Sequence, residues 1–232
     1  MLALILAAAL EQAVAPPPPP STGIRPSIIT QPDWLKRPDA ALMERYYPRD
    51  ATKYGLEGAA LIACKVATTG YLEGCAVTQE SLRGAGFGDA ALSLAARFRM
   101  LPMTKDGQPA AGGRINIPIR FRTPNPSPLP PQTREVILKP DLELLATADD
   151  VAQAYPAQAR PSGATGEVLM RCAAADGGEL RDCVALQERP QGLGFGEAAA
   201  TLAGKFRLKP AADGHAQAGA MVFFPIRLRP RP

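Results

Sequence analysis

The sequence has few of the residues on which enzymes and metal sites depend. Its 232 residues include one histidine, His215, and four cysteines, and no two cysteines are spaced as C-x-x-C. A single histidine leaves little room for a Ser/His/Asp arrangement, and zinc sites usually bring their ligands in closely spaced pairs. The missing C-x-x-C also argues against a thioredoxin-like redox motif. Since no carboxylate pair repeats at a spacing suited to acid–base work, we expect no enzyme, no metal site and no cofactor.

Long apolar runs are missing as well. Residues 1–10 are apolar, but a membrane-spanning helix needs about 20 such residues, so we expect no transmembrane helix. The A-x-A sequence at 13–15 resembles a signal-peptidase site and predicts export to the periplasm. No Lys or Arg precedes the apolar run, and Pro16 directly follows the A-x-A sequence, where cleavage would occur. Cleavage of residues 1–15 therefore stays open, as does an apolar start unrelated to export.

A basic stripe is the third missing feature. The chain has 26 Lys and Arg against 22 Asp and Glu, for a net charge of +4. The basic residues are scattered singly, and the aromatic residues occupy core-like positions instead of alternating with basic ones. Nucleic acid is therefore not an expected partner.

What the sequence does have is a tandem duplication. Tyr47-Pro48, Gly58, Cys64, Cys75, Gly86-Phe87-Gly88 and Phe98 recur 108 residues later as Tyr155-Pro156, Gly166, Cys172, Cys183, Gly194-Phe195-Gly196 and Phe206. The run Pro16–Pro20 predicts a polyproline spacer over residues 16–26, and five prolines in 123–131 predict a linker over 123–132. These breaks delimit a first copy, 27–122, and a second copy, 133–230.

Each copy shows the same order of signals, which predicts an α+β fold of α, ββ, α, β order. In the first copy, Asp39 precedes a short helix, and residues 59–66 and 72–78 read as a hairpin. An apolar stripe from Phe87 to Phe98 predicts a second helix, and residues 114–121 alternate strictly between apolar and polar. We expect a three-stranded antiparallel sheet in each copy, with helices packed on one face.

The cysteines are spaced to face each other within each hairpin. With two-residue loops at 69–70 and 177–178, Cys64 lies opposite Cys75 and Cys172 opposite Cys183. Counting from the turn places each pair at a hydrogen-bonded site with Cα atoms about 5.5 Å apart, which predicts two intradomain disulfides. Thr69 suits a positive-φ turn position poorly, and a bulged turn would shift the register by one and separate the cysteines. Structural disulfides are consistent with an oxidising compartment.

The glycine-rich segment 84–89 has the look of a phosphate-binding loop before a helix. The dinucleotide pattern requires a small residue where Asp89 stands and a parallel βαβ unit around it, and neither is present. We interpret the glycines as a sharp entry from strand to helix.

The whole pattern resembles the C-terminal domain of TonB-family proteins. The residues that carry the resemblance are Tyr47, Pro48, Gly58, Gly70, Ala90, Ala91, Phe98, Pro102, Asp106, Gly107, Pro109, Pro118, Ile119, Arg120 and Phe121, and in the second copy Tyr155, Pro156, Phe206, Pro210, Asp213, Gly214, Pro225, Ile226 and Arg227. The resemblance implies a periplasmic domain that binds an extended peptide of outer-membrane transporters as an added strand. Family transducers also carry a full membrane helix and a long Pro-rich span. Because both are lacking here, coupling to the proton-motive force is not expected.

The last strand of each copy, 113–121 and 221–228, is the candidate binding edge, since Pro118 and Pro225 cannot donate to a ladder and predict either a free edge or a bulge at that point. The predicted edge residues are Arg114, Ile115, Asn116, Ile117, Ile119, Arg120 and Phe121, with Val222, Phe223, Phe224, Ile226, Arg227 and Leu228. The alternative is that the chain or a second copy covers these edges, in a structural or regulatory envelope protein that binds no transporter peptide. A third alternative is a secreted thiol-disulfide enzyme, which would need reactive thiols in the native state and is excluded if both cysteine pairs form unreactive disulfides. The oligomeric state is not predicted.

Overall fold

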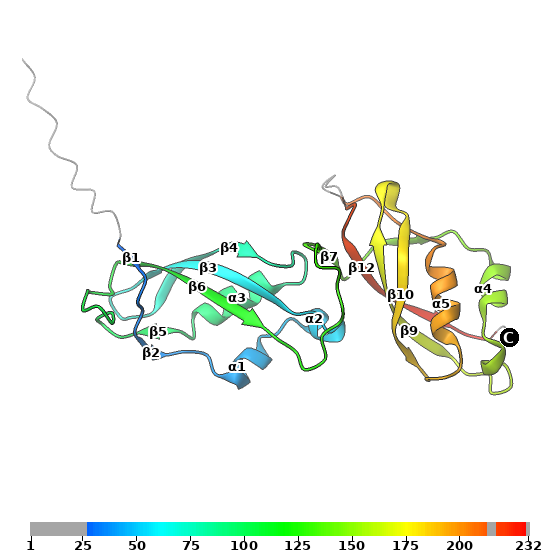
Figure 1. The fold of residues 1–232 in the computed structure, drawn as a ribbon, viewed down its shortest axis with the longest axis horizontal. Coiled ribbons are helices and arrows are strands. Elements are labelled where there is room, and N and C mark those ends of the chain that lie inside the picture. The colour runs from blue at the N-terminus through cyan, green and yellow to red at the C-terminus, as the bar shows by residue number, and fades with distance from the viewer. Residues whose placement is uncertain (1–26, 213–216, 231–232) are drawn as a thin grey trace, which may run out of the picture.

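The computed structural model describes residues 27–212 and 217–230. The predicted signal segment, the polyproline spacer and His215 lie outside the described residues. Two sheet-containing units follow each other along the chain, and each has α+β character (Figure 1).

The first copy contains three helices and six strands. They are β1 (Ile28–Ile29), β2 (Trp34–Lys36), α1 (Ala40–Arg45), α2 (Arg49–Lys53), β3 (Gly58–Val66), β4 (Leu72–Glu80), α3 (Phe87–Ala95), β5 (Arg99–Met100) and β6 (Arg114–Phe121). Asp39 caps α1 by accepting the N–H of Leu42 at 2.8 Å, as its position predicts.

The second copy repeats this order with two 3₁₀ turns. Its elements are β7 (Val136–Ile137), β8 (Leu142–Leu144), α4 (Ala148–Ala154), η1 (Ala157–Ala159), β9 (Gly166–Ala174), η2 (Asp176–Gly178), β10 (Leu180–Arg189), α5 (Phe195–Ala203), β11 (Phe206–Leu208) and β12 (Met221–Leu228).

The sheets differ from the predicted three antiparallel strands. Each is four-stranded and mixed, in the order β1-β6-β3-β4 in the first copy and β10-β9-β12-β7 in the second, because a two-residue strand pairs in parallel with the last strand. A separate two-stranded ladder, β2–β5 or β8–β11, accompanies each main sheet. The sequence pattern did not predict these short strands, since two or three residues are too few to show a period.

One helix covers one face of each sheet. The apolar stripes of α3 and α5 pack on the core faces, where Phe87, Ala91, Phe195 and Ala199 are fully buried. A Cβ atom at Gly58 would overlap the ring of Phe87, so this position of β3 requires glycine.

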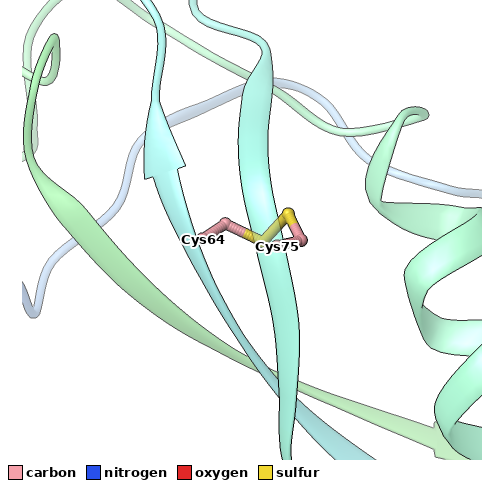
Figure 2. Close-up of a disulfide and its surroundings, with 2 residues drawn as sticks. All are labelled: Cys64 and Cys75. Carbon is pink, nitrogen blue, oxygen red and sulfur yellow. A yellow bond between two sulfur atoms is a disulfide. The ribbon is translucent and has the colours of Figure 1, made fainter.

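Both predicted cysteine pairs form disulfides, Cys64–Cys75, shown in Figure 2, and Cys172–Cys183. The predicted two-residue loop is wrong, because Ala67 donates its N–H to Tyr71 and the loop has three residues. This loop shifts the register, so Lys65 pairs with Glu73, and a bulge at Gly74 then shifts it back, so Ala63 pairs with Ala76. The two shifts cancel, which restores the opposed cysteines.

The second hairpin uses the same compensation with a different residue. Asp182, at the position equivalent to Gly74, forms the bulge with φ of 50°. The Cα atoms of each cysteine pair lie 4.1 Å apart, less than the predicted spacing of a hydrogen-bonded pair. Cys64 and Cys172 face the cores and are buried, so each disulfide joins the core face of one strand to its neighbour.

Candidate peptide-binding edge

The outward edge of β6 is identified by one backbone hydrogen bond. Arg114 donates its N–H to the carbonyl of Ser27 at 2.9 Å, on the side of β6 away from β3. Because backbone groups alternate along a regular strand, Asn116, Pro118 and Arg120 direct theirs to the same outward side. Pro118 thus stands where its missing N–H breaks no bond to β3, as its edge position requires.

The second copy has the same arrangement. Met221 donates its N–H to the carbonyl of Glu135 at 3.0 Å, which places the backbone of Phe223, Pro225 and Arg227 on the outward side of β12. Both prolines therefore lie on an edge and not within the central ladder.

The predicted edges are free only in part. The strand β1 pairs with Arg114 and Ile115, and β7 pairs with Met221 and Val222. Beyond these positions, no other described strand pairs with the outward side of β6 or β12. The chain itself therefore covers the start of each predicted binding edge, at Arg114–Ile115 and Met221–Val222, and not the part around Pro118 and Pro225.

The predicted edge residues fall into two groups. Eight face the cores and are buried: Ile115, Ile117, Ile119, Phe121, Val222, Phe224, Ile226 and Leu228. These side chains hold the sheets to their helices and are not open to a ligand on the outer face. Arg114, Asn116, Arg120 and Arg227 are exposed on the opposite face, while Phe223 is buried there.

The unpaired part of β6 borders a groove, which we call the edge groove. One hollow of about 840 Å³ lies among α1, α2 and the end of β6, and a second of about 510 Å³ lies between β2 and residues 118–120. The two hollows share Met43 and Arg120 in their linings, so they lie next to each other along the edge. Their apolar lining includes Trp34, Phe98 and Phe121.

Tyr47 anchors the wall of this groove. Its hydroxyl donates to the carbonyl of Leu56 at 2.7 Å, and its ring packs edge-on against Phe87 and Phe121. Burial, with a smaller contribution from Glu57, raises the pKa of Tyr47. The equivalent Tyr155 donates to the carbonyl of Ala164, so the Tyr-Pro pair has one structural role in both copies.

The groove concentrates positive charge. Its lining includes six basic residues, Lys36, Arg37, Arg45, Arg49, Arg120 and Arg122, and two acidic ones, Asp39 and Glu44. The remaining chain contains twenty basic and twenty acidic residues, so the groove accounts for the entire net charge of +4. Within the described part of the chain, none of the six basic side chains forms an ion pair.

In the second copy, the outer face of the sheet packs against the first copy. Figure 1 shows α4 and α5 on the far side of this sheet, with the strands toward the first copy. Phe223 is fully buried and joins the core of the first copy, with its ring centroid 5.0 Å from that of Tyr54. Leu169 and Leu186 pack on the same core from neighbouring strands.

Polar contacts surround this docked face. Lys139 pairs with Asp50 at 3.1 Å, and Arg83 pairs with Glu135 at 3.0 Å. The backbone of Val136 donates to the carbonyl of Arg83 at 2.9 Å. Burial, with a smaller contribution from Asp50, raises the pKa of Tyr54.

Sequence reasoning missed the docked face, although a signal was present. The first copy alternates polar and apolar residues at Arg114 to Ile117. The second copy has Met221 and Phe223 in place of Arg114 and Asn116, so the first half of β12 is apolar on both faces. A strand that is apolar on both faces is typically buried on both. Tyr54 had no such signal, because its equivalent in the second copy is Ser162.

The glycine loop is closed by carboxylates. Glu80 accepts the N–H of Gly88 at 3.0 Å, and the equivalent Glu188 accepts the N–H of Gly196. A side chain therefore already occupies the start of α3 and of α5, in agreement with the strand-to-helix interpretation. Among the residues described, no three His, Cys, Asp or Glu side chains gather as metal ligands, and no helix is long and apolar enough to span a membrane.

Residues 43–123 match the family model for the Gram-negative bacterial TonB protein C-terminal. This match supports a TonB-family assignment for the first copy, and that family is non-enzymatic and associated with transport. The matched range begins within α1 and extends just past β6, so it includes the unpaired edge and most of the first hollow.

A relative from Caulobacter vibrioides is similar over a shorter range. It is described as an uncharacterized protein and is 38% identical over 63 residues, which are 27% of this chain. The aligned region spans 63% of that relative, so the chain matches less than two thirds of its length.

Proposed function

We propose that this is a periplasmic TonB-like protein that binds extended peptide segments of outer-membrane transporters by strand addition on β6 of the first copy. The observation that carries the proposal is the outward side of β6 beyond Ile115, with which no other described strand pairs and which lies beside the edge groove. The family match covers this strand. An added strand supplies backbone hydrogen bonds along an edge, and pockets beside it select side chains.

Only part of the edge is suited to pairing. Asn116, Pro118 and Arg120 each offer an outward carbonyl, but Pro118 offers no N–H. The added strand therefore bonds to Arg120 through both backbone groups and bypasses one donor at Pro118. The second copy takes a supporting role, because its outer sheet face is docked on the first copy.

The test measures binding of synthetic transporter box peptides to the purified full chain by fluorescence anisotropy. We expect Arg120→Pro to abolish binding, because it removes the outward N–H without touching the ladder to β3. Arg120→Ala removes only the side chain and keeps the donor. Arg227→Pro makes the same backbone change at the equivalent position of β12 and is expected to leave binding intact.

A second candidate function has its own observation. The contact between Phe223 and Tyr54 docks the two copies against each other. A structural or regulatory envelope protein that binds no transporter peptide would also depend on such docking. That function becomes the better account if no box peptide binds the intact chain. Equal loss of binding in Arg120→Pro and Arg227→Pro would contradict a role confined to the first copy.

A further inference from the structure

The edge groove has two sides of different chemistry, and the difference bears on what an added strand must look like. This inference rests on the proposed function and concerns the composition of the peptide. Toward the core side, the groove is lined by Met43, Trp34 and Phe98. The basic side chains described above are exposed along the groove, and two of them, Arg120 and Arg122, follow the outer face of β6.

The alternation of a strand assigns these two sides to alternate ligand residues. Side chains of an added strand point in turn to the two faces of the sheet. One set lies on the face of Ile119 and Phe121, above the apolar lining. The other set lies on the face of Asn116 and Arg120, where the alternation also places Arg122, directly after the end of the strand. Arg45 and Arg49 belong to α1 and to the start of α2, on either side of Tyr47.

The charge of the groove favours acidic residues in the peptide, and Arg120 and Arg122 on the outer face assign them to the second set. Six basic side chains are countered by two acidic ones, and one of those, Asp39, already accepts the N–H of Leu42 as a helix cap. Arginine favours carboxylates through paired N–H donors, and unpaired arginines beside an open edge leave such donors available. The geometry points to an extended segment in which acidic and apolar residues alternate.

A lipid surface carries negative charge too, but the observations favour a peptide. The basic residues border an edge with unpaired backbone groups, which a strand can use and a lipid headgroup layer cannot. The groove is also hollowed and not flat, with apolar side chains at its base.

The experiment compares labelled peptides of eight residues, the length of β6, on the full chain by anisotropy. The first alternates Glu and Val, the second replaces each Glu by Gln, and the third has the composition of the first in two blocks. Three exposed ion pairs of ordinary strength correspond to roughly tenfold in Kd, so we expect the alternating Glu peptide to bind about tenfold more tightly than the Gln peptide. The preference should shrink as salt is raised, and the block peptide should bind weakly.

A charge-neutralised variant tests the named arginines. The triple change Arg45→Gln, Arg49→Gln and Arg122→Gln is expected to reduce the ratio of Gln-peptide Kd to Glu-peptide Kd from about tenfold to near one. The matched control, Lys105→Gln, Arg189→Gln and Arg229→Gln, removes the same charge from exposed positions outside the groove and should keep the preference.

The possible failures are distinguishable. If Glu and Gln peptides bind equally and Arg120→Pro abolishes both, the inference on acidic residues is wrong while strand addition stands. If neither these peptides nor the box peptides bind, both the inference and the proposed function are wrong.

If the block peptide binds as tightly as the alternating peptide, the groove attracts negative charge without selecting an alternating sequence, and the inference is wrong. Binding of the chain to phosphatidylglycerol vesicles, with loss in the triple variant and displacement of the peptide, would overturn the inference in favour of a membrane surface.

Discussion

The two copies share one fold and use it differently. In the first copy the outer sheet face bears Asn116 and Thr78, and it stays exposed. In the second copy the equivalent positions hold Phe223 and Leu186, and the face is docked. A few substitutions on one face thus separate a copy whose outer sheet face is exposed from a copy whose outer sheet face is docked. The difference teaches that the duplicated sequence preserves the cores, while the exposure of the outer face depends on residues that the cores do not constrain.

The largest expected difference between the two copies is the loss of stability when the docked ring of Phe223 is removed. Phe223→Ala should cost about 3–5 kcal/mol of unfolding free energy, as for other buried phenylalanines, because the cavity cannot be refilled. The equivalent Asn116→Ala on the exposed face should change stability by no more than about 0.5 kcal/mol. Urea unfolding of the full chain measures both.

The docking has a second readout. Because burial against Phe223 raises the pKa of Tyr54, Phe223→Ala should lower that pKa toward its ordinary value in a spectrophotometric titration. A stability loss below about 1 kcal/mol together with an unchanged Tyr54 titration would show that the copies are not held together by this contact.

The two disulfides are a feature that the copies share, and they should stabilise both copies to the same extent. Each closes a loop of the same sequence separation, 11 residues, so removal of either pair should cost about 2–3 kcal/mol. We expect Cys64→Ala with Cys75→Ala and Cys172→Ala with Cys183→Ala to have matching effects in chemical denaturation. A cost confined to one copy would refute equal roles for the two bridges.

The two bulge residues differ between the copies, and substitutions there should change stability by a smaller amount. Gly74 and Asp182 both have positive φ, but only Gly74 adopts it without steric cost. Gly74→Ala, with open space around its Cβ position, should destabilise by about 1 kcal/mol. Asp182→Gly should stabilise by up to about 1 kcal/mol. Denaturation midpoints with the disulfides intact measure both, and no change in Gly74→Ala would argue against a left-handed bulge.

The smallest effect concerns a helix start that differs between the copies. Asp150 completes a capping box with Thr147 and pairs with Lys205 at 2.7 Å, whereas the equivalent position in the first copy is Leu42. The hydrogen bond from Lys205, followed by those from Thr147, lowers the pKa of Asp150 to about 2. The folded state thus favours the charged carboxylate.

The stabilisation by Asp150 is therefore complete above its unfolded pKa of 3.8 and is lost as pH falls through about 2. We expect Asp150→Asn to be less stable than the wild type above pH 4 and equal to it near pH 2, in pH-dependent thermal unfolding. A difference that stays constant down to pH 2 would contradict the role of the charged form.

Much of each copy was predictable from local spacing. The helix after Asp39, the hairpin, the stripe of Phe87 and the alternation of 114–121 depend on neighbours along the chain, and the structure contains them near the predicted residues. The cysteine pairing was predicted correctly although the loop was not, because the bulge at Gly74 offsets the longer turn. The limits of the two copies and their linker, predicted from prolines, remain predictions.

The sequence by itself determined the duplication, the α+β class, the cysteine pairs and the core-facing residues, because each follows from a repeat or a period along the chain. Only the tertiary structure decided which stretch of β6 is open, since β1 is too short to be recognised and pairs with a strand more than eighty residues away. It also decided that Tyr54 meets Phe223 and that scattered arginines gather in one groove. These features depend on contacts between distant segments, and no local pattern encodes the distance between them.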